Sequence, residues 1–131
     1  MSDMLIRAAI EAMPHAYAPY SRFYVGAAIE DENGALHTGV NVENAAYPNG
    51  ICAETAAMAM MIQQDGTRIV KIAVSGGDGV LLCTPCGGCR QRIREFASAT
   101  TPVLICDGEG LKARFTLAEL LPHSFGPENL G

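Results

Sequence analysis

The chain has 131 residues, a formal net charge of -5 and 49% hydrophobic residues, which suits a single domain spanning residues 1–131 with a core that needs no disulfide support. The acidic balance excludes the basic footprint that nonspecific nucleic-acid binding requires, so a small molecule is the more natural partner. No apolar run approaches the roughly 18 residues of a membrane span, and the N-terminus lacks the features of a secretory signal. We therefore expect a cytoplasmic protein without membrane contact.

The first half of the sequence predicts a helix, a hairpin and a second helix. Residues 3–13 place apolar side chains on one stripe and are followed by a proline-rich turn. Residues 23–42 indicate two strands, because Asn33 and Gly34 occupy the turn position of a tight hairpin. Residues 52–64 are strong helix formers that are apolar almost all round, which predicts a central and buried helix.

The second half of the sequence alternates strands and helices. Residues 68–76 are rich in β-branched side chains and predict a strand, and residues 79–83 are either a further strand or a strand end. Residues 86–97 predict a third helix, residues 102–107 a short buried strand, and residues 116–122 a short helix. The order of elements predicts an α/β fold, a three-layer α/β/α sandwich whose central mixed sheet carries helices on both faces.

The cysteines are the most informative residues of the chain. In the cytoplasm thiols stay reduced, so clustered cysteines indicate a metal site or catalysis rather than disulfides. Cys86 and Cys89 form a Cys-x-x-Cys pair that puts two thiolates on one side of a helical turn. Cys52, like Cys86, begins a predicted helix, whose positive end favours a thiolate. Pro85 leaves Cys83 on the preceding strand or loop, where we interpret it as a small buried hydrophobic residue.

This pattern predicts a catalytic zinc site. Three thiolates and one open position, filled by water, are typical of catalytic zinc, whereas structural zinc is closed by a fourth protein ligand. Glu54 follows Cys52 by two residues on the first turn of a buried helix, from which its carboxylate can reach that water without binding the metal. Alone, Glu54 would be interpreted as an ordinary glutamate at a helix N-terminus. Together with the neighbouring cysteines, it is predicted to act as the general acid and base.

Two other classes of protein use cysteines at such spacings. A structural zinc module would need a fourth protein ligand, which Cys83 or Cys106 could supply. A thiol-redox protein would use the Cys-x-x-Cys pair itself, although no clear thioredoxin-like strand and helix surround it here. The three histidines lack ligand spacing to the cysteines.

Cys-Ala-Glu followed by Pro-Cys-x-x-Cys resembles the motif of the zinc-dependent nucleobase and nucleoside deaminases. Four segments in order are similar to those of the small cytidine deaminases and cover most of the chain: YAPYSRFYVGAA, GVNVENAAYPNGICAE, TPCGGCRQ and LLPHSFGPENL. The resemblance implies hydrolytic deamination of cytidine and 2′-deoxycytidine to uridine and 2′-deoxyuridine, with release of ammonia, in pyrimidine salvage. Deaminases of blasticidin S share the two cysteine motifs, but NVEN and FGPENL favour plain nucleosides.

The resemblance also implies the zinc ligands. One zinc ion per chain is then held by three thiolates, those of Cys52, Cys86 and Cys89, and Glu54 moves the protons. Related proteins with three cysteine ligands often carry an arginine directly after that glutamate, where this sequence has Thr55. Either the positive ends of the two helices or Arg90 could offset the charge of the three thiolates, and the sequence leaves both open.

Substrate contacts are implied in the same way. Asn41 and Glu43 would hydrogen-bond the ribose, Phe23 would pack against the pyrimidine, and the backbone of Ala53 would read the edge of the base. Without the resemblance, Asn41 and Glu43 would simply be polar positions on a strand. The short members of the family are homotetramers in which neighbouring subunits complete each active site, a role that falls here on Ala45, Tyr47 and Phe125.

Overall fold

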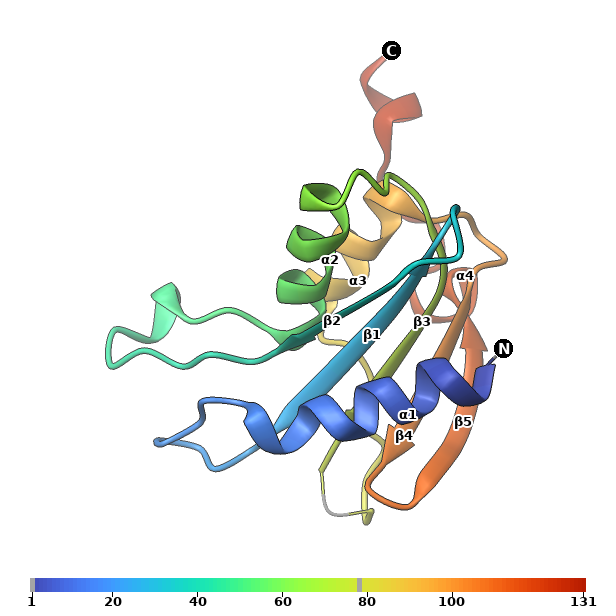
Figure 1. Cartoon of the computed structure of the whole chain (residues 1–131). Coiled ribbons are helices and arrows are strands. Elements are labelled where there is room, and N and C mark those ends of the chain that lie inside the picture. The colour runs from blue at the N-terminus through green and yellow to red at the C-terminus, as the bar shows by residue number, and fades with distance from the viewer. Residues whose placement is uncertain (1, 78) are drawn as a thin grey trace.

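A mixed sheet of five strands forms the centre of the computed structural model, which describes residues 2–77 and 79–131 (Figure 1). In chain order the strands are β1 (Val25–Asp31), β2 (Leu36–Val40), β3 (Ile69–Gly76), β4 (Pro102–Asp107) and β5 (Gly110–Thr116). Their order across the sheet is β2-β1-β3-β4-β5. β3 and β4 run parallel to each other, and the other neighbouring strands are antiparallel.

Helices cover both faces of this sheet, as Figure 1 shows. The helices are α1 (Ser2–Ala12), α2 (Ala53–Gln63), α3 (Gly87–Phe96) and α4 (Leu117–Leu120), with 3-10 turns at Met13–His15, Tyr47–Asn49 and Pro127–Leu130. Alternate strand residues face opposite layers: Ala28, Ala73 and Leu104 pack under α1, whereas Ala27, Val74 and Ile105 pack with α2, α3 and α4. The predicted three-layer α/β/α sandwich is confirmed. Within the described residues, no helix is both long enough and apolar enough to span a membrane.

Three local expectations differ from the structure. Residues 79–83 form neither a strand nor a strand end but an irregular loop. The sequence analysis did not predict β5, an edge strand whose residues are mostly exposed or half-buried. The helix α2 is not buried all round, because Met60 and Ile62 are 42% and 46% exposed in this chain.

Two glycines let the helical layers approach the sheet closely. A Cβ atom at Gly39 in β2 would lie 2.3 Å from the backbone nitrogen of Ala57 and 2.6 Å from the carbonyl oxygen of Ala53, both in α2. A Cβ atom at Gly26 in β1 would lie 2.3 Å from the carbonyl oxygen of Ala9 in α1. Any other residue at either position would push a helix away from the sheet.

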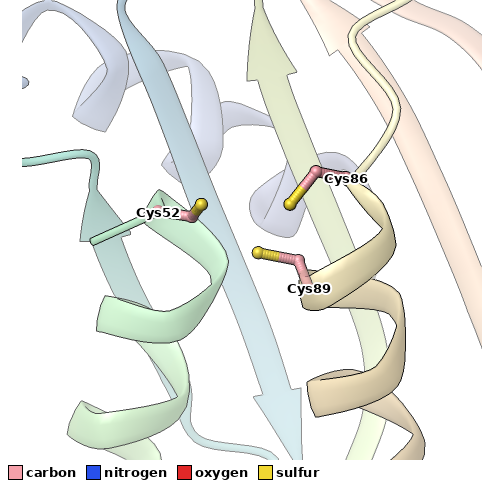
Figure 2. A group of neighbouring side chains, drawn as sticks. All are labelled: Cys52, Cys86 and Cys89. Atoms are coloured by element: carbon pink, nitrogen blue, oxygen red, sulfur yellow. The ribbon is translucent and has the colours of Figure 1, made fainter. Parts of the chain in front are cut away.

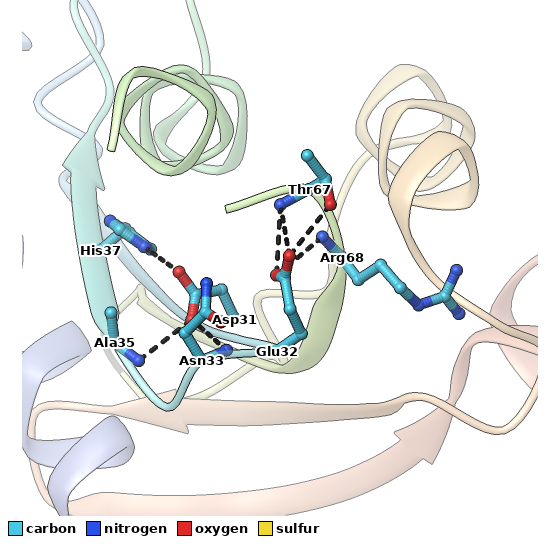
Figure 3. A network of polar contacts seen from close by, with 7 residues as sticks. All are labelled: Asp31, Glu32, Asn33, Ala35, His37, Thr67 and Arg68. Carbon is cyan, nitrogen blue, oxygen red and sulfur yellow. Dashed lines mark hydrogen bonds and ion pairs between the residues drawn. The ribbon is translucent and has the colours of Figure 1, made fainter. Parts of the chain in front are cut away.

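A buried polar cluster holds the hairpin turn between β1 and β2 (Figure 3). The Asp31 carboxylate accepts hydrogen bonds from His37 Nε2 at 2.7 Å and from the backbone N–H groups of Asn33 at 2.8 Å and Ala35 at 3.0 Å. Asp31 and His37 are only 2% and 6% exposed. The hydrogen bond from His37, helped by the two backbone N–H groups, outweighs burial and lowers the pKa of Asp31 below its usual value. Gly66, beyond the C-terminal end of α2, packs against the same carboxylate.

The neighbouring Glu32 joins the hairpin to the segment before β3. Its carboxylate accepts hydrogen bonds from the Thr67 backbone N–H, the Thr67 hydroxyl and the Arg68 backbone N–H at 2.9–3.1 Å (Figure 3). These contacts fix the chain just beyond the C-terminal end of α2, while the N-terminal end of the same helix carries Cys52.

The low pKa of Asp31 predicts a specific loss of stability in acid. A carboxyl group whose pKa is lower in the folded than in the unfolded protein stabilises the fold above the unfolded pKa, and this stabilisation is lost as the pH falls through the folded pKa. Asp31→Asn should therefore lower the free energy of unfolding by about 2 kcal/mol at neutral pH, and by much less in acid. Urea unfolding from about pH 7 to about pH 3 measures both changes.

Asp65→Asn is the matched control, because Asp65 is exposed and has a positive φ of 71° that asparagine also tolerates. The control should show the pH dependence of the parent protein. A constant difference in stability between Asp31→Asn and the parent at every pH would contradict the prediction.

Candidate metal centre and substrate pocket

Three cysteine sulfurs meet where two helices begin. Cys52 is the N-cap residue of α2, Cys86 is the N-cap residue of α3, and Cys89 lies in the first turn of α3. Their Sγ atoms all lie within 4.8 Å of one another, and Figure 2 shows the side chains pointing toward a common centre. Thiolates bound tetrahedrally to zinc at about 2.3 Å stand about 3.8 Å apart, so this donor set fits the ion with small adjustments. Among the described residues no fourth side chain joins the group, which leaves one position open.

The local electrostatics favour a thiolate at Cys86 most. Burial raises the pKa of Cys86, but hydrogen bonds from the backbone N–H of Cys89 and from the side chains of Cys89 and Cys52 outweigh it, and the pKa ends below its usual value. Burial raises the pKa of Cys52 and of Cys89, and the nearby carboxylate of Glu54 raises that of Cys89 further. A metal ion bound here therefore displaces protons from the buried sulfurs.

The positive ends of α2 and α3 lie at the sulfurs, whereas Arg90 donates its hydrogen bonds elsewhere. Its guanidinium donates to the Pro85 carbonyl at 2.7 Å, the Leu120 carbonyl at 2.8 Å and the Thr84 hydroxyl at 3.1 Å. Thr55 places its hydroxyl 4.0 Å from Cys89 Sγ. Of the two sources of compensating charge that the sequence left open, the helix N-termini are the one supported by the geometry.

The other two cysteines lie outside the group of three. Cys83, in the loop before α3, is half-buried against the core, and burial raises the pKa of its thiol to about 11. Cys106 in β4 is 1% exposed and packs with the residues under α1. Neither belongs to the group of side chains that could hold a metal, so neither supplies the closing ligand of a structural zinc module.

Glu54 lies beside the three sulfurs on the first turn of α2. It is 5% exposed, and burial raises the pKa of its carboxyl group, although its own backbone N–H and a hydrogen bond with the Cys89 side chain act in the opposite direction. A buried carboxyl group next to an open metal position is the arrangement that general acid and base catalysis requires.

A cavity of about 600 Å³ opens in front of this group. Its volume lies within the range of small-molecule sites, about 300–1,000 Å³. The residues predicted to contact substrate in the same chain, Phe23, Asn41, Glu43 and Ala53, all line it, and so does Tyr47, which was predicted to serve a neighbouring subunit. Ala45 and Phe125 are exposed and do not line this cavity.

Another part of the cavity wall is a loop held by Asn41 and Glu43. Asn41 accepts a hydrogen bond from the Val25 backbone N–H and donates one to the Phe23 carbonyl, both at 2.8 Å. Glu43 accepts from the backbone N–H groups of Tyr20 at 2.9 Å and Ser21 at 3.1 Å. The sequence analysis did not identify Tyr20 and Ser21 as part of the site, and the available signal was their place three and two residues before Phe23 in the segment YAPYSRFYVGAA.

Comparisons with known proteins agree with this geometry. Residues 2–105 match the family model described as the cytidine and deoxycytidylate deaminase zinc-binding region. The chain belongs to this deaminase family. Within the family it is 39% identical to a cytidine deaminase of Sporosarcina psychrophila, over 98% of this chain and 93% of that one. It is 40% identical to a cytidine deaminase of Halalkalibacterium halodurans, over 98% of this chain and 96% of that one.

Solved structures of deaminases in the family share the fold. The crystal structure of a cytidine deaminase from Burkholderia pseudomallei superposes with a TM-score of 0.88 at 36% identity, covering 95% of this chain and 99% of that chain. The crystal structure of a cytidine deaminase from Mycobacterium tuberculosis superposes with a TM-score of 0.82 at 36% identity, covering 95% and 97% of the two chains. The family match and the three sulfurs together identify the cofactor as zinc.

Removing one sulfur of the group should empty the metal site. We expect Cys86→Ala to lower bound zinc well below one ion per chain, because two thiolates cannot replace the lost ligand. Cys83→Ala is the matched control, since it removes a thiol only three positions away that lies outside the group. Elemental analysis of the purified variants measures zinc directly. Equal zinc in Cys86→Ala and the parent would rule out Cys86 as a ligand.

Proposed function

We propose that this protein is a zinc-dependent cytidine deaminase that converts cytidine and 2′-deoxycytidine to uridine and 2′-deoxyuridine and releases ammonia, a reaction of pyrimidine salvage. The observation that carries the proposal is the buried Glu54 carboxyl group beside three sulfurs with an open fourth position, at the inner end of a cavity large enough for a nucleoside. The relatives named cytidine deaminase, which match nearly the whole chain, support the choice of substrate.

In the proposed mechanism the chain's own catalytic group is Glu54. Zinc held by the three cysteines supplies a Lewis acid that makes water nucleophilic near neutral pH. Glu54 takes a proton from the attacking water and delivers it to ring N3 of cytosine, so that an oxygen atom can bond to C4. It then takes the second proton from the new hydroxyl group on C4 and passes it to the amino group on the same carbon. The carbon–nitrogen bond breaks, and ammonia leaves.

The substrate contacts in the proposal follow the cavity from the metal outward. The backbone of Ala53, next to Cys52, reads the edge of the base. Phe23 packs against the pyrimidine ring, and its exposed fraction of 48% gives the ring enough accessible surface for that contact. Asn41 and Glu43 hydrogen-bond the sugar at the open end of the cavity.

The proposal includes a homotetramer. Several large apolar side chains are more than half exposed in the single chain, among them Tyr47, Val80, Leu81, Phe125 and Leu130. So much exposed apolar surface on a small chain is typical of an interface. In the tetramer Ala45, Tyr47 and Phe125 complete the sites of neighbouring subunits. The free thiols of all five cysteines are consistent with the cytoplasm as the compartment.

The reaction is tested by measuring both products together. We expect purified, zinc-loaded protein to release equal amounts of uridine and ammonia from cytidine. Glu54→Gln keeps the shape of the side chain and should keep zinc, but should lower kcat by at least about 100-fold because it cannot carry protons. Turnover by Glu54→Gln close to that of the parent would remove Glu54 from the mechanism. The absence of both products from the folded, zinc-loaded parent would refute cytidine as the substrate.

Two experiments test the tetramer: the molecular mass in solution and the activity of mixtures of variant chains. We expect a mass in solution four times that of the 13.8 kDa chain. Phe125→Ala should be weakly active, because each site would lack an aromatic side chain from its neighbour. Mixed tetramers of Glu54→Gln and Phe125→Ala chains should recover activity, since some sites then combine an intact Glu54 with an intact Phe125. Mixing Glu54→Gln with Cys86→Ala is the control. It should recover no activity, because each change inactivates the site of the chain that carries it.

A further inference from the structure

We propose that Ser21 is a positioning residue: it fixes the direction of the Glu43 carboxylate so that the carboxylate offers one acceptor position to one hydroxyl group of the substrate's sugar. The inference rests on the proposed nucleoside substrate. It adds a residue that acts through Glu43 rather than by touching the substrate.

Ser21 lies at the centre of the contacts between the loop and Glu43. Its hydroxyl donates a hydrogen bond to Glu43 Oε2 and accepts one from the backbone N–H of Phe23 at 3.0 Å. Its own backbone N–H and that of Tyr20 donate to Glu43 Oε1 at 3.1 Å and 2.9 Å. One carboxylate is therefore held on both oxygen atoms by a turn that ends at Phe23.

These contacts leave Glu43 with a single free acceptor position. A carboxylate has about four lone-pair positions, two on each oxygen. The two N–H groups fill those of Oε1, and the Ser21 hydroxyl fills one of Oε2. The remaining position belongs to Oε2, the oxygen whose direction is set by Ser21 alone.

Asn41 completes a matching pair of groups. It lies two residues before Glu43 and lines the same cavity. One of its two amide hydrogens is used on the Phe23 carbonyl, and its oxygen is used by the Val25 backbone N–H. One free donor on Asn41 and one free acceptor on Glu43 fit a hydroxyl group, which accepts one hydrogen bond and donates another. A methyl group offers neither, whereas a sugar hydroxyl combines both on one oxygen atom.

The loop keeps other connections when the Ser21 hydroxyl is removed. The backbone of Tyr17 exchanges hydrogen bonds with that of Asn41 at 3.0 Å and Glu43 at 2.8 Å. The two Asn41 side-chain bonds and the two N–H groups on Glu43 Oε1 also remain. Ser21→Ala should therefore fold and bind zinc normally, but Oε2 loses its partner, so the carboxylate can pivot about its remaining contacts at Oε1.

The test compares Ser21→Ala with the parent on three substrates: cytidine, 2′-deoxycytidine and 3′-deoxycytidine. We expect Ser21→Ala to raise KM for cytidine about tenfold, the scale of a hydrogen bond to a charged group, with kcat within about twofold. The increase should disappear for the deoxynucleoside that lacks the hydroxyl bound by Glu43. Ser21→Thr keeps the hydroxyl and should restore most of the affinity. Ser98→Ala is the control, because Ser98 lies in a turn before β4 with its hydroxyl near Thr100 and Thr101.

Two results would overturn the proposal. One is an unchanged KM in Ser21→Ala. The other is the same increase on all three substrates, because a purely structural role for the loop would weaken every substrate alike. Calorimetric binding of uridine and its 2′- and 3′-deoxy forms repeats the comparison without turnover. A parent protein that does not deaminate cytidine would thus refute the proposed function, while the ratio of affinities between parent and Ser21→Ala would still decide the role of Ser21.

Discussion

The contact between α2 and β2 at Gly39 determines where α2 places its part of the site. Because the two backbones are in contact there, the distance between the first turn of α2 and the sheet is fixed. Cys52 and Glu54 belong to that turn, so the metal ligand and the buried carboxyl group are set by the same contact. A helix end resting on a sheet is more rigid than a loop, which suits a site whose reacting atoms must lie within hydrogen-bonding distance. The polar cluster of Asp31 and Glu32 holds the other end of α2, far from the chemistry.

The two halves of the cavity are built differently. The metal half lies at two helix N-termini. Arg90 donates hydrogen bonds both to the carbonyl of Pro85, just before α3, and to a carbonyl at the end of α4. The half proposed to bind the sugar follows β2, where the chain leaves the sheet, and depends on side-chain hydrogen bonds to a loop. A rigid metal half and a more adjustable sugar half would separate the chemical step from the choice of sugar. This is why a change at Ser21 should act on KM, whereas a change at Glu54 should act on kcat.

The sequence predicted the parts of the molecule that depend on neighbours along the chain. Periodicity located the helices, Asn33 and Gly34 marked the hairpin turn, and the cysteine spacing led to the metal centre, because each of these signals lies within a few residues. The strand β5 was missed because an edge strand with many exposed residues lacks the apolar pattern of a buried one. The tie between Ser21 and Glu43 spans 22 positions and the approach of Gly39 to Ala57 depends on packing, so neither leaves a local pattern.

The exposed face of α2 and the position of Phe125 share one physical explanation. The apolar pattern of α2 predicted burial on every side, yet Met60 and Ile62 are exposed, and a second hollow of about 470 Å³ lies between α2 and α3 beside Ile62 and Phe96. Phe125, predicted to serve the site of a neighbouring subunit, does not line the cavity of its own chain. The apolar pattern of a sequence reflects burial within the chain and burial against its partners. The structure of a single chain shows only the burial within that chain. In the proposed tetramer, neighbouring subunits would cover the free face of α2, and Phe125 would reach a cavity other than its own.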